Sequence, residues 1–289
     1  MATIRSIRRE LAEQLALAGL AEAQHEALLI VAGTLAWPVS RLLAEPEHRV
    51  SLQQAEQLRR RAVRRAGHEP LAYILGQTAF GGLDFVVGPG TLVPRPDSEV
   101  LVETARRLLA ERGSRGEVRL LDTCTGSGAI GICLAWQLDQ DGYRVRLSLV
   151  DREADALAWA RRNSRLLPER VALRVIQADL FPGDEDPYDL VTANPPYIPS
   201  GQIDHLMPEV SVHEPRMALD GGPDGLAFYR RLAGQAPAHL RRDGFLVLEH
   251  GYDQADAISA ILSAQGFAVR PAVLDFGGHL RVTAGQAVR

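Results

Sequence analysis

One turn organises this sequence, and it reads Leu121-Asp122-Thr123-Cys124-Thr125-Gly126-Ser127-Gly128. The turn closes a predicted strand over 118–122 and opens a predicted helix over 128–138. In parallel sheets, ligands bind at the carboxyl ends of strands, where glycines let a ligand approach the backbone and the helix N-terminus. A glycine turn alone is weak support for such a site, because many turns of this kind only reverse the chain.

Polar residues also follow the next three predicted strands, which cover 145–151, 171–177 and 188–193. The second strand ends at Asp151, whose carboxylate can accept hydrogen bonds from both hydroxyls of a ribose. Asp179 follows the third strand. The fourth leads into Asn194-Pro195-Pro196-Tyr197. Four successive strand ends therefore indicate a site for a nucleoside-like cofactor.

Strands alternate with helices beyond residue 115. Amphipathic helices are predicted over 154–166 and 225–240, and a fifth strand over 245–249. This alternation favours right-handed crossovers and a mainly parallel sheet that is covered on both faces. The segments 268–273 and 279–283 can add an antiparallel pair at the edge.

The first 66 residues have helical periodicity and almost no strand signal. Helices are predicted over 4–17, 21–31, 38–46 and 51–65, the last capped by Ser51. The inner positions of the first and last helices are predicted to be Ile4, Ile7, Leu11, Leu15 and Leu17, and Leu52, Ala55, Leu58 and Val63.

Short β-prone runs follow this helical part of the chain. Gly81-Gly82 lies between two of them and predicts a β-hairpin. The predicted division is a helical domain over 1–75, a hairpin linker over 76–95 and a sheet domain over 96–289.

An arginine cluster marks the last predicted helix of the helical domain, with Arg59, Arg60, Arg61, Arg64 and Arg65. One interpretation is a docking face for an acidic or phosphate-bearing partner. The other, which we favour, is a solvated helix end where cations are favourable near the carboxyl terminus.

Composition excludes several kinds of chemistry. The 289 residues suggest two domains at about 150 residues each. All 32 basic residues are arginine, so no lysine can form a Schiff base or complete a Gly-Lys-Ser/Thr phosphate loop. The net charge of -4 disfavours binding of nucleic acid through an overall basic field.

Cysteine and histidine usage points away from disulfides and metals. Cys124 and Cys133 are nine positions apart and fit neither a disulfide framework nor a CxxC pair. The eight histidines lack metal-ligand spacing. The start of the chain does not resemble a signal peptide, and no apolar stretch reaches the roughly 18 residues of a membrane span. We therefore expect a cytoplasmic protein without a metal.

With these residues in place, the sequence resembles class I S-adenosylmethionine-dependent methyltransferases that act on a planar amide or amine nitrogen. The flanking segments are similar to the bacterial peptide chain release factor glutamine methyltransferases. These segments are Glu69–Gly76, Leu92–Glu99, Asn194–Ile198, Glu214-Pro215, Leu248–Gly251, Asp275–Gly277 and Arg281–Thr283. The resemblance spans residues 50 to 285.

The resemblance implies an α/β fold with a Rossmann-like seven-stranded methyltransferase sheet and a small N-terminal helical domain joined by a β-hairpin. It implies S-adenosylmethionine as cofactor, bound by Asp122, Cys124, Thr125, Gly126, Ser127, Gly128, Asp151, Asp179, Leu180 and Asn194. It implies that class 1 peptide chain release factors are the substrate, contacted by the helical domain and methylated on the glutamine of their Gly-Gly-Gln loop. We expect a monomer that binds neither nucleic acid nor membrane.

Two positions depart from the family pattern. Cys124 stands where the family turn usually has glycine, and a cysteine there is similar to the sibling family that methylates a glutamine of a ribosomal protein. Leu180 stands where relatives often have an aromatic residue. Packing of the adenine is therefore expected to use Leu180 and the neighbouring Phe181.

The tetrad Asn194-Pro195-Pro196-Tyr197 is the predicted catalytic and substrate-binding element. The Asn194 side-chain oxygen and the Pro195 carbonyl can each accept one hydrogen of the substrate amide. The two prolines stiffen the acceptor site, and the Tyr197 ring can lie against the planar amide.

Other acidic and basic residues near the turn receive lesser assignments. Asp122 can cap the turn while it borders the cofactor. Glu103 and Arg95 are expected to border the pocket, whereas Glu249 is taken as structural.

Two other functions remain open from the residues. An adenine N6-methyltransferase of nucleic acid would use the same tetrad on a flipped base. A cofactor-sensing protein without transfer activity is the alternative outside catalysis, and the intact tetrad argues against it.

Overall fold

The structure is a computed structural model that describes residues 2–113, 115–183 and 186–288. Its contacts divide the chain into two compact units. The helical unit consists of residues 2–77 together with 207–213, and the sheet unit consists of 78–206 together with 214–288. Each unit has its own hydrophobic core.

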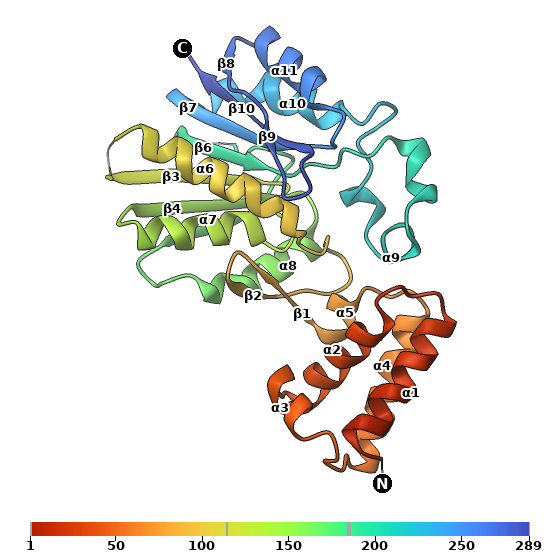
Figure 1. Cartoon of the computed structure of the whole chain (residues 1–289). Helices are drawn as coiled ribbons and strands as arrows, with labels where there is room; N and C mark the ends of the chain where they lie inside the picture. The colour runs from red at the N-terminus through yellow and green to blue at the C-terminus, as the bar shows by residue number, and fades with distance from the viewer. Residues whose placement is uncertain (1, 114, 184–185, 289) are drawn as a thin grey trace. The chain divides into compact units, whose positions relative to one another are not determined.

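The helical unit is built from short helices in the red and orange part of Figure 1. Within the first 77 residues they are α1 (Ile4–Leu17), α2 (Ala23–Leu35), α3 (Val39–Ala44), α4 (Leu52–Ala66) and α5 (Leu71–Leu75). Thr3 and Ser51 each form a capping box that satisfies free amides at the start of α1 and α4. The predicted cap at Ser51 is thereby confirmed.

The core of this unit contains most of the predicted inner positions, but three of them are exposed. Leu17, Leu52 and Val63 are 91%, 78% and 61% exposed. In α4 the buried residues are Ala55, Leu58, Ala62 and Arg65. At about 3.6 residues per turn, the stripe that begins at Ala55 and Leu58 continues through Ala62, so Val63 is turned about 100° away.

The hairpin strands are β1 (Gln77–Phe80) and β2 (Leu83–Val86), joined at Gly81-Gly82 as predicted. The sheet unit begins at Thr78, the second residue of β1. Its main sheet has the order β5-β4-β3-β6-β7-β10-β8. The strands are β3 (Glu117–Thr123), β4 (Arg144–Asp151), β5 (Ala172–Gln177), β6 (Tyr188–Ala193), β7 (Leu240–Glu249), β8 (Phe267–Val269) and β10 (Leu280–Ala287).

The first five of these strands are parallel, and β10 is antiparallel to both β7 and β8. The predicted antiparallel pairing of the last segments is confirmed, but β10 lies inside the sheet and β8 forms the edge. The two-residue β9 (Val273–Leu274) also pairs with β10, so the described residues contain eight strands in this sheet rather than seven.

Helices cover both faces of the sheet (Figure 1). One face packs against α6 (Glu99–Glu111), α7 (Ala129–Gln140) and α8 (Ala154–Asn163), and the other against α10 (Ala227–Gln235) and α11 (Ala255–Ala264). Successive strand residues alternate between the two cores: Leu120 joins the first and Leu121 the second.

The predicted helix over 225–240 is too long. α10 ends at Gln235, a 3₁₀ turn covers Ala236–Ala238, and β7 already begins at Leu240. Pro237 explains this end, because proline lacks the amide hydrogen that would continue the helix. A four-residue helix, α9 (Pro208–Ser211), completes the helical unit.

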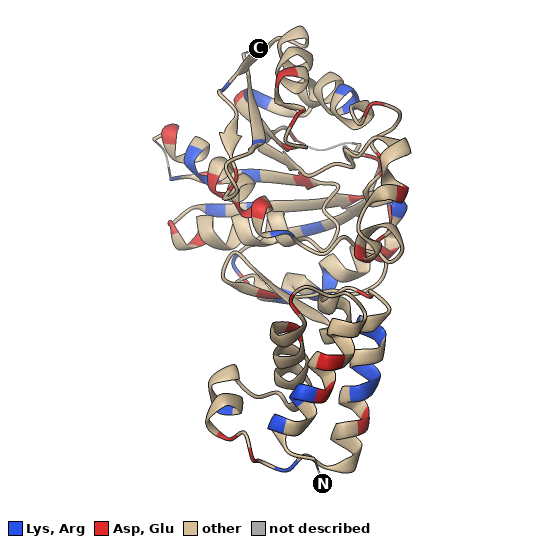
Figure 2. Cartoon of the chain, turned by 45° about the vertical axis from the view of Figure 1, so that its right-hand side comes forward, with Lys and Arg blue, Asp and Glu red and all other residues tan. Residues whose placement is uncertain are grey.

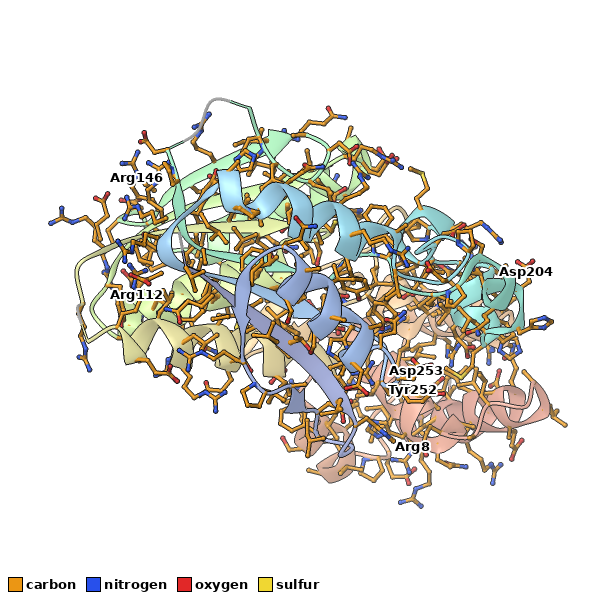
Figure 3. The ribbon with its side chains drawn as sticks, turned by 90° about the horizontal axis from the view of Figure 1, so that it is seen from above. Arg8, Arg112, Arg146, Asp204, Tyr252 and Asp253 are labelled. Carbon is orange, nitrogen blue, oxygen red and sulfur yellow. The ribbon has the colours of Figure 1, made fainter. Side chains whose placement is uncertain are left out.

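The strand order reverses at β3, with β4 and β5 on one side and β6 and β7 on the other. Such a switch point opens a crevice at the carboxyl ends of the strands. In Figure 3, Arg112 and Arg146 lie toward one end of the sheet, while Tyr252 and Asp253, which follow β7, lie toward the other.

Within the described residues no helix is long and apolar enough to cross a membrane.

Candidate active site

A cavity of about 260 Å³ lies at the carboxyl edge of the parallel strands, within the sheet unit. Nine predicted site residues line it: Cys124, Thr125, Gly126, Ser127, Asp151, Asp179, Leu180, Asn194 and Pro196. The other four, Asp122, Gly128, Pro195 and Tyr197, are not part of its lining. The cavity thus joins the ends of β3, β4, β5 and β6 into one site.

The turn between β3 and α7 depends on backbone conformations that favour glycine. Gly126 and Gly128 have φ angles of +55° and +82°. A Cβ at Gly128 would come within 2.9 Å of Ile132. The Gly126 amide donates to Asp151 Oδ2 at 2.9 Å, so the turn is tied to the end of β4.

Asp122 lies beneath this turn and is buried. It accepts hydrogen bonds from the Thr125 hydroxyl, the Thr192 hydroxyl at 2.7 Å and the Gly131 amide at 3.2 Å. Burial raises the pKa of Asp122 to about 6, although these three bonds act in the opposite direction. The contacts favour the interpretation of Asp122 as a residue that fixes the turn.

Asp151 offers the acceptor expected for a ribose. Its two carboxylate oxygens accept from the amides of Gly126 and Glu153, at 2.9 and 3.0 Å. Burial raises the pKa of Asp151. Because a carboxylate has about four acceptor positions, the two backbone bonds leave capacity for hydroxyl groups in the cavity. The acceptor positions at this end of the cavity therefore fit the hydroxyl groups of a nucleoside.

The end of β5 presents an apolar surface to the cavity through Leu180, which is buried and has a φ angle of 71°. The Thr123 hydroxyl donates to the Leu180 carbonyl at 2.5 Å and holds this conformation. Phe181 is not in the lining and stacks on His239 instead, with 4.5 Å between ring centroids. Phe181 therefore lies outside the lining of the cavity, because the left-handed turn at Leu180 directs its ring elsewhere.

Asn194 is the first residue after β6, and its Nδ2 donates to the Ser98 hydroxyl at 3.5 Å. Pro195 and Pro196 are buried and Tyr197 is half-buried. Burial raises the pKa of Tyr197 to about 12, so its hydroxyl stays protonated at neutral pH. The Tyr197 carbonyl accepts from Gln254 Nε2 at 3.0 Å, which anchors the end of the tetrad.

The loop over 91–98 forms one wall of the cavity. Glu214, which is buried, accepts from the Val93 amide at 3.3 Å and from Arg95 at 2.6 Å. Arg95 lines the cavity as expected. Glu103 does not, because it is exposed and faces Arg106.

The five arginines of α4 all have partners inside the helical unit. Ion pairs join Arg59 to Glu10, Arg60 to Glu56, Arg64 to Glu69, and Arg65 to both Glu26 and Glu209, and Arg61 donates to Thr34. Figure 2 shows basic and acidic segments interspersed along these helices. The arrangement gives a paired helix surface instead of an unneutralised docking face.

The sequence predicts a structural Glu249, and the structure places it at the same sheet edge as Asn194. It is the last residue of β7 and is buried. Burial raises the pKa of its carboxyl group to about 7. The signal in the sequence is its position, because it ends the fifth strand just as Asp122, Asp151 and Asn194 mark other strand ends.

No cluster of three metal-binding side chains occurs in the part of the chain that the structure describes.

Family models match two parts of the chain: "PrmC N-terminal domain" over residues 6–76 and "Methyltransferase small domain" over residues 98–222. Among curated proteins, it is similar to "Release factor glutamine methyltransferase" of Agrobacterium fabrum. The two are 38% identical over 272 residues, which cover 93% of this chain and 92% of the relative. The protein with the same description from Bradyrhizobium diazoefficiens is 37% identical, with 98% and 95% covered.

Among solved structures, the chain is similar to a methyltransferase from Pyrococcus furiosus. The TM-score is 0.53 at 20% identity, with 73% of this chain and 92% of the other covered. This likeness concerns the fold, and it agrees with a Rossmann-like methyltransferase sheet.

Proposed function

The chain belongs to the release factor glutamine methyltransferase family, and from that premise we propose that it methylates the side-chain amide nitrogen (N5) of a glutamine in peptide chain release factors. The methyl donor is S-adenosylmethionine, and the target is the glutamine of the Gly-Gly-Gln loop of class 1 release factors. One observation carries the proposal beyond the family: Asp151 and Asn194 line the same cavity. A nucleoside acceptor and an amide acceptor therefore serve one site.

The residues at the β3, β4 and β5 ends would hold the cofactor. Asp151 would accept from its ribose hydroxyls, Leu180 would pack against its adenine, and the turn around Gly126 leaves room for close approach to the backbone. When bound, S-adenosylmethionine supplies a methyl group on a sulfonium, which is already strongly electrophilic. The chain therefore has to orient the acceptor nitrogen more than to activate the methyl group.

A glutamine amide is a poor nucleophile because its nitrogen lone pair is delocalised into the carbonyl. The Asn194 side-chain oxygen and the Pro195 carbonyl would each accept one N–H of the glutamine amide. They would place its nitrogen within roughly 3 to 3.5 Å of the methyl carbon. These acceptors favour the positive charge that develops on the nitrogen during transfer. The proton becomes acidic only as transfer proceeds, so no strong base is needed beforehand.

Tyr197 and the prolines restrict what can occupy this position. Two successive prolines fix their own φ angles and stiffen the acceptor carbonyl. The half-buried Tyr197 would lie against the planar amide and exclude non-planar groups. We therefore expect selection of an amide over an alkyl amine.

We assign contact with the body of the release factor to the helical domain over residues 1–75, joined through the hairpin over 76–95 to the methyltransferase domain over 96–289. We propose a monomer as the active form. Because release factors work on ribosomes, we place the reaction in the cytoplasm.

The direct test uses S-adenosylmethionine labelled with tritium in its methyl group. The protein is expected to label a class 1 release factor, and a Gln→Ala change in the Gly-Gly-Gln loop should abolish the label. Label that persists in that variant would overturn the proposed target. Parallel reactions test the alternatives. Label on a ribosomal protein would indicate a ribosomal-protein methyltransferase, and label on DNA or RNA would indicate an adenine methyltransferase. Cofactor binding without any transfer would indicate a cofactor sensor.

Asn194→Ala tests the acceptor directly. We expect kcat to fall by about 100-fold or more, because a pre-aligned acceptor of the transition state is lost, while cofactor affinity changes little. Calorimetry of cofactor binding and initial rates measure the two quantities. Gln202→Ala, on an exposed position, is the control and should match the wild type. An unchanged kcat in Asn194→Ala would remove this residue from the reaction.

A further inference from the structure

Glu249 stands next to Asn194 at the end of two neighbouring strands. β6 and β7 pair in parallel with Ala193 opposite Leu248, so the next residue of each strand is Asn194 and Glu249. Glu249 is 2% exposed. Its Oε2 has no hydrogen-bond partner among the described residues. A buried carboxylate with an unused oxygen requires an explanation, because an unpaired buried acceptor is costly.

The Ser98 hydroxyl and the Asn194 amide lie close enough to the Glu249 carboxylate to lower its pKa, against the larger effect of burial. Ser98 Oγ also receives the Asn194 Nδ2 at 3.5 Å. The three groups therefore form a small cluster, and Ser98 and Asn194 also line the cavity. The charged and titratable groups that interact with Glu249 include Arg281 on β10, Asp97 before α6, Tyr197 after β6 and Tyr229 on α10.

The backbone around Glu249 is held from several directions. The Tyr229 hydroxyl donates to the Glu249 carbonyl at 2.8 Å. Arg281 donates to the next carbonyl, that of His250, at 3.1 Å and to Asp275 at 2.9 Å. The carboxylate thus stands on a fixed strand end instead of a loop that could adapt to its neighbours.

The chemistry of the pair determines which way the Asn194 amide faces. An ionised carboxylate only accepts hydrogen bonds, so it can pair with the Asn194 NH₂ group and not with its oxygen. The oxygen is then on the other branch of the planar amide. An amide turned the other way would present N–H donors to the N–H groups of the substrate, and the two would repel.

We propose that Glu249 is a positioning residue that holds the Asn194 side-chain oxygen toward the substrate amide. This inference rests on the proposed function and adds a residue to it. Ser98 shares the role, since its hydroxyl accepts from Asn194 Nδ2 at 3.5 Å and lies near the Glu249 carboxylate. Glu249 does not touch the substrate.

The ionisation of Glu249 gives this role a measurable signature. Once protonated, Glu249 carries an O–H donor, which can pair with the Asn194 oxygen and stabilise the unproductive orientation. Burial raises the pKa of Glu249 to about 7. The rate of methyl transfer is therefore expected to fall as pH decreases through neutrality. Protonation of Glu249 should cause this acidic limb of the pH–rate profile.

The experiment compares the wild type with Glu249→Gln, Glu249→Ala and the exposed control Glu111→Gln. The measured quantities are kcat and cofactor affinity, followed from about pH 5.5 to 9. Glu249→Ala should lower kcat about tenfold or more with little change in cofactor affinity, because the acceptor loses its orientation. Glu249→Gln can still accept from Asn194, so it should retain most of its rate at high pH and lose the acidic limb. Glu111→Gln should behave as the wild type.

A second measurement does not depend on turnover or on a well-folded alanine variant. The ¹⁵N and ¹H signals of the Asn194 side-chain amide should shift with pH near 7 in the wild type and stay constant in Glu249→Gln. Equal kcat in Glu249→Ala and wild type, an acidic limb that persists in Glu249→Gln, or Asn194 signals that do not titrate would each overturn the inference. If the wild type labels no release factor, the proposed function fails, while the Asn194 signals still decide the role of Glu249.

Discussion

Cys124 and Leu180 both hold left-handed backbone conformations in the wall of the cavity, with φ angles of 54° and 71°. Such angles are unfavourable for residues that carry a Cβ, and glycine is the usual occupant. The structure therefore locates backbone strain in the wall of the cavity.

Cys124→Gly is expected to be tolerated. Relief of about 1 to 2 kcal/mol of left-handed strain is offset by about 0.5 to 1 kcal/mol of extra chain entropy in the unfolded state. The free energy of unfolding should therefore stay level or rise slightly, whereas Cys124→Val should lower it because a β-branched side chain worsens the strain. Urea denaturation measures both. A clear loss of stability in Cys124→Gly would contradict the strain argument.

Asp122 gives a prediction about pH, with a sign that differs from that of ordinary acids. Burial raises its pKa from 3.8 to about 6, so the folded state keeps a proton that the unfolded state has already lost. The contribution of Asp122 to stability therefore falls as pH rises through this window. Asp122→Asn has no such proton. As pH rises from about 4 to 7, its free energy of unfolding should therefore increase relative to that of the wild type by on the order of 3 kcal/mol.

Urea unfolding of both proteins at about pH 4 and pH 7 measures this difference. Effects of the amide on hydrogen bonding are the same at both pH values and cancel. Asp256→Asn, on an exposed position, should show no such change. A difference that shrinks as pH rises would mean that the folded state favours the charged form of Asp122.

The sequence predicted which polar residues follow the strands, but not which of them face the cavity. Asp122 and Asp151 look equivalent in the chain, since each follows a buried strand. Hydrogen bonds from Thr192 and Gly131 occupy the carboxylate oxygens of Asp122, and these partners are 70 and 9 residues away in the chain. Non-local contacts of this kind leave no periodic pattern in the sequence.

At the level of elements, α4 shows how far periodicity can go. Its cap at Ser51 and its inner residues Ala55 and Leu58 follow from local rules. Local spacing also pairs Arg60 with Glu56. The partners of Arg59 and Arg65 do not follow from local rules, because Glu10, Glu26 and Glu209 come from other segments.

Arg65→Ala is expected to loosen the segment Met207–His213. Arg65 is buried and bonds Glu26 at 2.6 Å and Glu209 at 3.0 Å. Removing Arg65 leaves the carboxylates of the cluster partly buried and unpaired. The free energy of unfolding should therefore fall by about 3 to 5 kcal/mol. Hydrogen exchange should therefore accelerate in this segment, and chemical denaturation should show the loss of stability.

Arg60→Ala is the matched control on the same helix, because the Arg60–Glu56 pair is exposed and adds less than about 1 kcal/mol. Equal effects of the two substitutions would mean that Arg65 contributes no more than a surface ion pair.

At the level of the whole molecule, strand and helix alternation was enough to predict the parallel sheet and its covered faces. It could not predict that β10 lies inside the sheet, since antiparallel insertion depends on pairing with both β7 and β8. Nor could it show that Met207–His213 packs with the helices of the first 77 residues.

Cofactor binding should stabilise the sheet unit specifically. Every residue that lines the cavity belongs to that unit. At a concentration 100 times its Kd, S-adenosylhomocysteine should add about 2.7 kcal/mol to the unfolding free energy of the sheet unit. Hydrogen-exchange mass spectrometry should show protection around 124–130, 151–156 and 178–181 and none in α1. Equal protection of α1 would contradict a cofactor site confined to the sheet unit.

The membership of Met207–His213 in the helical unit has a practical meaning for anyone who recombines genes of this kind. A chimera made by exchanging only the first 77 codons would separate Arg65 from Glu209 and give each parent half of an ion cluster. The exchangeable module is bipartite, so a functional transplant has to carry both stretches of coding sequence together.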